Sequence, residues 1–254
     1  MFALVFARET PPTQVADRFV RLGTSLCNFY LVEDGGRVTI VDTGVPAYYA
    51  QLDRGLEALG RGRGDVDAIV LTHGHSDHIG FAEQARGELG VPVYVHRDDE
   101  NLTTTGKAFG KREAPMLPYL RYPQAWKLLA HFSTAGLPKP VHEVRTFADG
   151  DTLDVPGRPR VIHTPGHTAG HVVFHFESQG VLALGDLLCT LNPLTGRRGP
   201  QLLPRALNNS SGTMLDSLSK IEGVDAAVLA FGHGEPWTGG AADAVRRARE
   251  VGPT

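Results

Sequence analysis

The sequence predicts a domain of the α/β (α+β) class in which two similar halves place their sheets face to face. Predicted strands and helices alternate along most of the 254 residues, which is the pattern of this class. One apolar run occurs twice, since residues 66–71 read VDAIVL and residues 224–229 read VDAAVL. When both copies are extended without gaps, His75 falls opposite His233. Each half thus carries polar side chains at the ends of its strands. This arrangement predicts a site along the edge that both sheets share.

The composition is that of a globular protein with a substantial core, with 41% hydrophobic and 21% charged residues. We therefore expect one domain over residues 1–254. A net charge of -3 gives no basic excess, so a nucleic acid is not an expected partner. No apolar stretch reaches the length of about 18 residues that a membrane span needs. The two cysteines, Cys27 and Cys189, are too few for a disulfide framework and suit a reducing compartment, which predicts a cytoplasmic location.

The N-terminal half is predicted to alternate strands and helices. We interpret the apolar start, Met1–Ala7, as an edge strand, because it is short and lacks the cationic residue that precedes the core of a signal peptide. A β-hairpin is indicated where two β-branched and aromatic runs flank Asp34-Gly35-Gly36. Apolar residues then recur at helical spacing up to two glycines, Gly60 and Gly90, where helices naturally end. The expected strands are 28–32, 37–41, 68–71 and 91–95, and the expected helices are 48–59 and 81–89.

From Arg97 to Val144 the pattern of strands and helices loosens. Prolines interrupt this segment, and one helix-like piece is expected at Ala125–Phe132. Within a compact domain, an insertion at 97–144 is typical of a lid or specificity cap over a site. Regular elements resume after it, with a terminal helix predicted to begin after Gly240. The other elements expected here are strands near 160–162, 172–176, 181–184 and 226–230 and a helix at 214–221.

The densest group of chemically active side chains is the segment 72–78, which reads THGHSDH. After a strand, an extended segment sends alternate side chains to one side, so His73 and His75 can reach one ion. Asp77 and His78 follow where the next helix is expected to begin, and they point elsewhere. Imidazole and carboxylate groups at this density match the ligand preferences of zinc and can serve two neighbouring metals. In the alternative interpretation, Asp77 only caps the helix and the histidines lie on a loop without binding a metal.

A second group of such side chains lies at 163–171, which reads HTPGHTAGH. This segment begins where a predicted strand ends. His167 stands on the Pro-Gly turn and is the histidine that we select as a ligand. His171 is interpreted as a residue that orients a ligand, or as the first residue of the next strand. His163 is interpreted as an ordinary structural histidine on its strand.

Two further polar residues end apolar strands beside glycines, which allow close approach of the backbone. These are Asp186, after Gly185, and His233, between two glycines. Together with the two histidine motifs they supply the remaining ligands of a two-metal centre. Cys189 lies close to Asp186 in sequence, and we interpret it as a buried thiol rather than a nucleophile.

With these motifs in this order, the sequence resembles the metallo-β-lactamase-fold hydrolase superfamily from Asp42 through His233. The resemblance implies a four-layer αββα sandwich with a dinuclear metal centre that holds two Zn²⁺ per chain, with Fe or Mn as other possible metals. Asp42, at a strand end, is implied to be a buried group that supports the ligand loop. The implied ligands are His73, His75 and His167 for the first metal, Asp77, His78 and His233 for the second, and Asp186 as the bridge between them.

The resemblance also implies the reaction. A hydroxide that bridges the two metals would attack a small ester, lactone or thioester, and Asp77 would accept a proton. β-Lactam-cleaving members carry cysteine or serine where this chain has Asp186, so the sequence is similar to the glyoxalase II and lactonase-like branch rather than to a true class B β-lactamase. Three alternatives stay open: a phosphodiesterase or nuclease of the same fold, a mononuclear iron enzyme of the persulfide dioxygenase type, and a metal-binding protein without turnover. His75, where the flavodiiron branch has glutamate, disfavours an iron redox role.

Two features bear on the small-molecule substrate. Aromatic residues of the 97–144 insertion could line an apolar pocket or could anchor the insertion to its own domain. Arg197 and Arg198 could bind an anionic group, although a surface turn is the interpretation that we prefer. The aromatic residues are Tyr119, Tyr122, Trp126 and Phe132.

Overall fold

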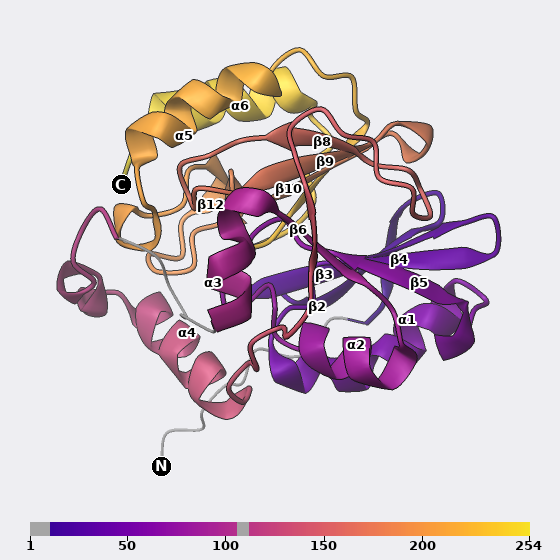
Figure 1. Ribbon diagram of the computed structural model, residues 1–254. Helices are drawn as coiled ribbons and strands as arrows, with labels where there is room; N and C mark the ends of the chain where they lie inside the picture. The colour runs from indigo at the N-terminus through magenta and orange to yellow at the C-terminus, as the bar shows by residue number, and fades with distance from the viewer. Residues whose placement is uncertain (1–10, 106–111) are drawn as a thin grey trace.

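A computed structural model describes residues 11–105 and 112–254 of the chain. Its first half forms a seven-stranded sheet whose strand order follows the sequence (Figure 1). Neighbours are antiparallel from the first strand to the fourth and parallel from the fourth to the seventh. The edge strand expected at Met1–Ala7 lies outside the described residues. The strands are β1 (Thr13–Ala16), β2 (Phe19–Thr24), β3 (Cys27–Asp34), β4 (Arg37–Val41), β5 (Val66–Val70), β6 (Val93–His96) and β7 (Arg145–Phe147).

The second half forms a four-stranded sheet of order β13-β10-β9-β8. β10 is parallel to β13 and antiparallel to β9, which is antiparallel to β8. A small hairpin of β11 (Cys189–Leu191) and β12 (Arg198–Gln201) follows β10. The four strands of the sheet are β8 (Arg160–His163), β9 (Val172–Phe176), β10 (Val181–Gly185) and β13 (Val228–Phe231).

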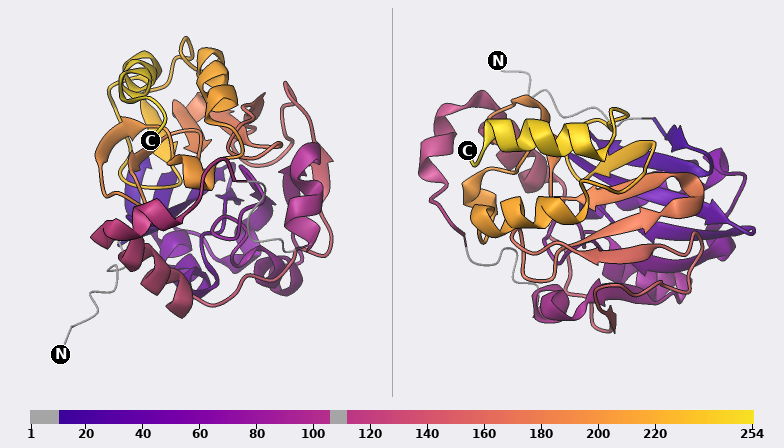
Figure 2. Two further views of the ribbon diagram at one scale, coloured as in Figure 1. Left: turned by 90° about the vertical axis from the view of Figure 1, so that its left-hand side faces the viewer. Right: turned by 90° about the horizontal axis from the view of Figure 1, so that it is seen from above.

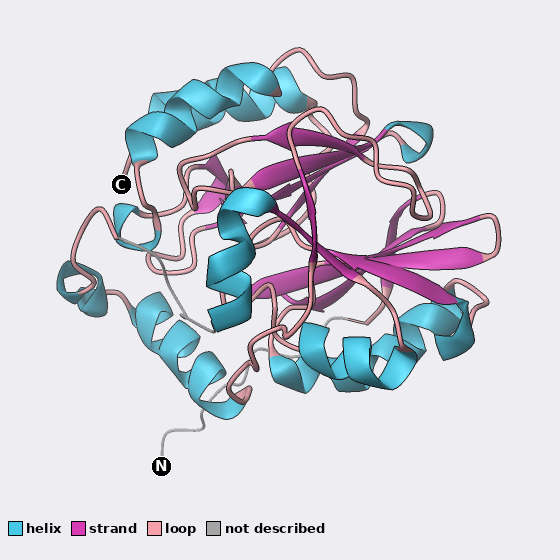
Figure 3. Ribbon diagram, in the orientation of Figure 1, coloured by secondary structure: helices cyan, strands magenta, loops and turns pink. Residues whose placement is uncertain are grey.

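The two sheets lie face to face with helices on both outer sides, so the fold is the αββα sandwich (Figures 1 and 3). Helices α1 (Leu52–Ala58) and α2 (Ala82–Leu89) cover the first sheet. Helices α5 (Ser211–Ser217) and α6 (Ala241–Val251) cover the second.

Alternation along the strands explains why three apolar layers form. In β10, Leu182 and Leu184 pack against the outer helices. Val181 and Ala183 point the other way and pack between the sheets. Every residue of β10 is buried, as is typical of a strand covered on both faces.

Several predicted elements are confirmed and some boundaries move. The hairpin of β3 and β4 forms, and Gly35 and Gly36 both have positive φ, as its tight turn requires. Gly90 ends α2 in the left-handed conformation. β6 begins two residues later than expected, because Pro92 cannot donate to the ladder. The helix expected at 48–59 divides into a 3₁₀ turn at Pro46–Gln51 and α1.

The described part of the insertion at 97–144 includes the α-helices α3 (Glu100–Thr105) and α4 (Pro123–Thr134). Figure 2 shows α4 at one end of the sandwich. Two contacts attach α4 to the segment after β4: His131 Nε2 lies 3.0 Å from the Tyr48 hydroxyl, and Ala47 donates its amide to the Ala135 carbonyl. In the part of the chain that is described, no helix is long and apolar enough to cross a membrane.

Candidate metal centre

The seven side chains selected as ligands from the sequence gather in one place, although they come from both halves of the chain. They form three overlapping groups, and in each group the nitrogen and oxygen atoms lie within 4.8 Å of one another. All seven residues are buried. The groups are His73, His75 and His167; His73, His78 and Asp186; and Asp77, His78 and His233.

Three imidazole nitrogens face one another in the first group. His75 Nδ1 lies 2.8 Å from His167 Nε2, which lies 3.2 Å from His73 Nε2. Each contact between two ring nitrogens can hold only one proton, so three converging nitrogens cannot all be satisfied by one another. A cation at their centre would accept all three lone pairs.

Asp186 joins this group to the other side of the cluster. Its Oδ2 lies 3.3 Å from His167 Nε2 and 3.1 Å from His233 Nε2. His233 Nε2 in turn lies 3.6 Å from Asp77 Oδ2. Asp186 Oδ1 faces His78 Nε2 at 3.4 Å. The Asp186 carboxylate therefore lies beside His78 of the first histidine motif, His167 of the second and His233 after β13.

In most of these imidazoles, the ring nitrogen that does not face the cluster contacts another group of the chain. This arrangement fixes the orientation of a ring and is typical of metal-ligating histidines. The His233 Nδ1 contact with the Leu26 carbonyl is the shortest. The other contacts are His73 Nδ1 to Thr72 Oγ1 at 3.1 Å, His78 Nδ1 to Asp42 Oδ2 at 2.9 Å and His167 Nδ1 to Asn208 Oδ1 at 3.0 Å.

Asp42 lies directly beneath the ligand loop, where the resemblance predicted it. It follows β4 with a φ of 56°, in the left-handed region that aspartate tolerates better than most residues. Its carboxylate accepts hydrogen bonds from the amide and the hydroxyl of Thr72, both at 2.8 Å. The start of the HxHxDH segment is thereby fixed to the end of the neighbouring strand.

Two buried residues that the sequence interpretation did not select also hold the loops. Asp99 accepts hydrogen bonds from the amide of Gly74 at 3.0 Å, the hydroxyl of Thr168 at 2.7 Å and the amide of Gly170 at 2.8 Å. Asn208 orients His167. Asp99 connects the two histidine loops, and its signal in the sequence was the pair of aspartates that follows β6 after Arg97.

The remaining candidates lie around the cluster. His171 Nε2 accepts the amide of Asp186 at 3.0 Å, so it supports the backbone of the central carboxylate. His163 lies away from the cluster and stacks on His96, with ring centroids 4.2 Å apart. Cys189 is buried, and burial raises the pKa of its thiol well above the usual range, which disfavours a nucleophilic thiolate.

A second histidine and carboxylate group, His96, Asp98 and His163, lies outside this cluster. The two rings are nearly parallel, with an angle of 11° between their planes. Lone pairs of imidazole lie in the ring plane, so parallel stacked rings do not direct them toward one ion. His163 Nε2 also contacts the Ala169 carbonyl at 2.8 Å. We interpret this group as a structural pair.

The electrostatics favour neutral imidazoles on one side of the cluster. Burial, reinforced by neighbouring imidazoles, lowers the pKa of His73 and His75 well below the ordinary value, and burial also lowers that of His167. A neutral ring is the form that binds a metal. On the other side burial acts in the same direction, but the carboxylates of Asp186 and Asp42 raise the pKa of His78 well above its ordinary value.

These residues fit a metal. Among the described residues, His78 Nε2 and Asp186 Oδ1 are buried atoms without a well-formed hydrogen bond, and they face each other at 3.4 Å. Buried polar groups are nearly always satisfied, so such atoms require an explanation, and a bound cation provides one. Gly232 makes room for them, because a Cβ there would collide with Asp186 Oδ1. Nitrogen and carboxylate donors are the set that zinc prefers.

The cluster opens into a cavity of about 300 Å³. Of the four aromatic residues singled out in the insertion, Phe132 lines this cavity. Tyr119 instead anchors the insertion, since its hydroxyl bonds the Thr254 carbonyl at 2.8 Å. Trp126 is largely exposed and bonds the Leu120 carbonyl. Arg197 precedes β12 and Arg198 is its first residue; both are exposed, and neither lines the cavity.

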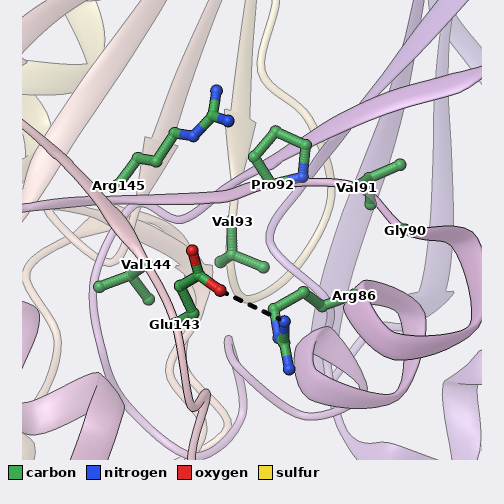
Figure 4. A pocket seen from close by; sticks show the side chains of 8 residues that line it. All are labelled: Arg86, Gly90, Val91, Pro92, Val93, Glu143, Val144 and Arg145. Atoms are coloured by element: carbon green, nitrogen blue, oxygen red, sulfur yellow. Dashed lines mark ion pairs between the residues drawn. The ribbon is translucent and has the colours of Figure 1, made fainter.

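Another cavity, of about 200 Å³, lies between the end of α2 and strands β6 and β7 (Figure 4). Arg86 and Arg145 line it together with Glu143. Arg86 bonds both carboxylate oxygens of Glu83, at 2.8 and 2.9 Å, and Arg145 bonds the Tyr94 hydroxyl at 3.1 Å. Both arginines therefore have partners within the chain, and this cavity shares no lining residue with the one at the histidine cluster.

An αββα sandwich that gathers buried imidazoles and carboxylates at its strand ends defines a class of metal-binding hydrolase folds. The sequence profile of the Metallo-beta-lactamase superfamily matches residues 22–233, and the chain belongs to this superfamily. The family indicated by the sequence motifs is thereby confirmed.

Relatives are similar over most of their length. The probable metallo-hydrolase YflN of Bacillus subtilis is 27% identical over 229 residues, which cover 86% of this chain and 84% of YflN. The uncharacterized protein Rv2581c of Mycobacterium tuberculosis is 31% identical over 232 residues, covering 86% of this chain and 91% of Rv2581c. The crystal structure of the metallo-beta-lactamase family protein TTHA1429 from Thermus thermophilus superposes with a TM-score of 0.64 at 28% identity, over 94% of this chain and 79% of that one.

Proposed function

We propose that this metallo-hydrolase holds two zinc ions and hydrolyses a small ester, lactone or thioester. The observation that carries the proposal is the position of Asp186. Its two carboxylate oxygens face His167 and His233 on one side and His78 on the other, at 3.1 to 3.4 Å. A carboxylate shared by two neighbouring groups of nitrogen donors is the arrangement that a bridged pair of metals needs.

The proposed ligand sets follow the groups found in the structure. One metal would be held by three imidazoles and the other by two imidazoles and a carboxylate, with Asp186 between them. When bound, zinc would lower the pKa of water toward neutrality and polarise a carbonyl oxygen. The sets are His73, His75 and His167 for the first metal and Asp77, His78 and His233 for the second.

Asp77 is proposed as the proton acceptor. It is buried among the imidazoles, and it is also among the residues that line the cavity. A carboxylate at that position reaches both the donor cluster and a substrate in the cavity, as a general base requires. His233 lies beside it, with 3.6 Å between Nε2 and Asp77 Oδ2.

The insertion is proposed as the lid of the same domain. Its residues Met116, Leu128 and Phe132 line the same cavity as the imidazoles of the cluster. An apolar wall would exclude water from the reacting carbonyl and strengthen the local electrostatics. Both cysteines are buried free thiols, which supports the proposed cytoplasmic location.

Metal analysis and a substrate panel test this function. Elemental analysis of the purified protein should give about two zinc ions per chain. One iron per chain with oxygen consumption would favour the dioxygenase instead, and no bound metal would refute the proposal. The panel compares p-nitrophenyl acetate, a homoserine lactone, an acyl-glutathione and bis-p-nitrophenyl phosphate. Turnover of the phosphodiester alone would favour the phosphodiesterase.

A further inference from the structure

The cavity at the histidine cluster has two chemically different sides. Metal-centre residues form one side: His75, Asp77, His167, Asp186 and His233. Apolar side chains form most of the rest, from the insertion and from two later loops. They include Met116, Leu128, Leu129, Phe132 and Leu137 of the insertion. A substrate in this cavity thus meets both the polar groups of the metal centre and hydrocarbon side chains.

Two of the apolar residues are unusually exposed. Leu129 is 46% exposed and Leu137 is 90% exposed, and both line the cavity. Grouped exposed apolar side chains are typical of ligand-binding grooves, because a ligand that covers them removes their surface from water. An apolar ligand in the cavity would cover these two side chains.

We propose that the cavity is a binding subsite for an uncharged aliphatic acyl chain of medium length. This inference rests on the proposed function, since the acyl carbonyl would lie at the metal centre and the chain against the insertion. The volume of about 300 Å³ is at the lower end for ligand pockets. At about 30 Å³ per small group, it admits roughly ten non-hydrogen atoms, which is an ester group and a chain of roughly six to eight carbons.

Beyond the proposed metals, the described lining offers few groups that would recognise a nucleotide. Among the described lining residues, Arg112 is the one lysine or arginine side chain, whereas phosphate recognition uses clusters of cations and stacking aromatic rings. Phe132 is the one phenylalanine, tyrosine or tryptophan among those residues. The wall has the chemistry of a hydrocarbon chain rather than of a base or a phosphate.

A chain-length series tests the subsite on the metal-loaded protein. We expect kcat/KM for p-nitrophenyl esters to rise about three- to fourfold for each added methylene from acetate toward octanoate, as burial of a methylene group predicts. The rise should stop when the cavity is full. A flat series, or acetate as the best ester, would overturn the proposal. A preference for an acyl chain that ends in a carboxylate would also overturn it.

Two exposed leucines of the insertion provide a matched pair of variants. Leu129 lines the cavity, whereas Leu117 is 75% exposed and does not. Leu129→Ser should lower the octanoate-to-acetate ratio of kcat/KM about five- to tenfold, and Leu117→Ser should leave this ratio unchanged. Equal effects of both variants would refute the assignment of the wall.

Binding to the metal-free protein separates this proposal from the hydrolase itself. Octanamide, an uncharged probe, should bind the chelated protein with a negative heat-capacity change, and Leu129→Ser should weaken that binding. If no ester is hydrolysed but octanamide binds in this way, the reaction is wrong and the subsite stands. If esters are hydrolysed without dependence on chain length and octanamide does not bind, the subsite is wrong and the reaction stands.

Discussion

Asp42 and His78 face each other in the interior, with 2.9 Å between Oδ2 of the carboxylate and Nδ1 of the ring. They belong to different loops, 36 residues apart in sequence. Since the carboxylate accepts, Nδ1 carries a proton, and Nε2, which faces Asp186, is the nitrogen that would bind a metal. A residue behind the cluster thus determines which nitrogen of His78 can bind a metal.

Asp42→Asn should therefore weaken metal binding. Asparagine tolerates the left-handed backbone at this position, but its amide group would replace an acceptor, so one of the contacts to Thr72 or His78 is lost. We expect zinc to dissociate about 10- to 100-fold more readily, as is usual for a residue that supports a ligand. Competition with a chelating dye measures this affinity.

A matched control for this variant lies in the same sheet. Asp67→Asn removes an exposed carboxylate of β5. This carboxylate pairs with Arg37 and is not part of the imidazole cluster. Zinc affinity should stay within about twofold of the original protein, since exposed pairs contribute little. Equal losses in both variants would show that Asp42 does not act through His78.

Asp99→Ala should both destabilise the fold and reduce turnover. Its buried carboxylate accepts three hydrogen bonds from the two histidine loops. Removing it leaves buried donors unsatisfied, at a cost of roughly 2–5 kcal/mol in the free energy of unfolding. Urea unfolding of the metal-free proteins measures this loss.

The neighbouring aspartate is the natural comparison. Asp98 has a side chain that is 50% exposed, so Asp98→Ala should change the free energy of unfolding by less than about 0.5 kcal/mol. If the two alanine variants have the same stability, Asp99 does not connect the loops.

These residues show how much of the site could be predicted from the sequence. His73, His75, Asp77 and His78 lie within six positions, so their chemistry is visible as a local pattern. Asp99 could not be selected, because its partners Gly74 and Thr168 become neighbours only when the two sheets pack.

In the fold, too, local features could be predicted and long-range contacts could not. The hairpin of β3 and β4 depends on a local turn and its strands were predicted closely. The aromatic residues of the insertion were harder, since Tyr119 and Phe132 have similar apolar character in sequence. Only the path of the insertion places Phe132 in the cavity and Tyr119 against the C-terminal residues.

Asp186→Ala tests the bridging role. We expect activity to fall by at least about 100-fold, because the carboxylate touches imidazoles on both sides of the cluster. Zinc content should fall from about two to about one per chain, while the metal-free variant stays folded by circular dichroism. Asp225→Ala, at an exposed position, serves as the control. Unchanged turnover in Asp186→Ala would remove this residue from the mechanism.

Glu83 gives a prediction about stability and pH. It lies in the first turn of α2, where it bonds Arg86 and accepts the amide of His142 at 3.1 Å. These contacts lower the pKa of Glu83 to about 2, the bond with Arg86 contributing most. The side chain is 12% exposed, so solvent screens these contacts only in part.

A depressed pKa in the folded state stabilises the protein above the ordinary pKa of glutamate, and this stabilisation is lost as the pH falls toward 2. Glu83→Gln should therefore cost roughly 1–2 kcal/mol in the free energy of unfolding at pH 7, and the difference from the original protein should shrink below pH 4. Glu143→Gln removes a carboxylate that is 85% exposed and 3.9 Å from the same Arg86, and it should change stability little at either pH. Urea unfolding of chelated samples at pH 7 and pH 3 tests this. The charge effect is only partly lost at pH 3, so the Glu83→Gln deficit should be clearly smaller there than at pH 7. A deficit of the same size at both pH values would mean that lost packing, rather than the lost charge, is responsible.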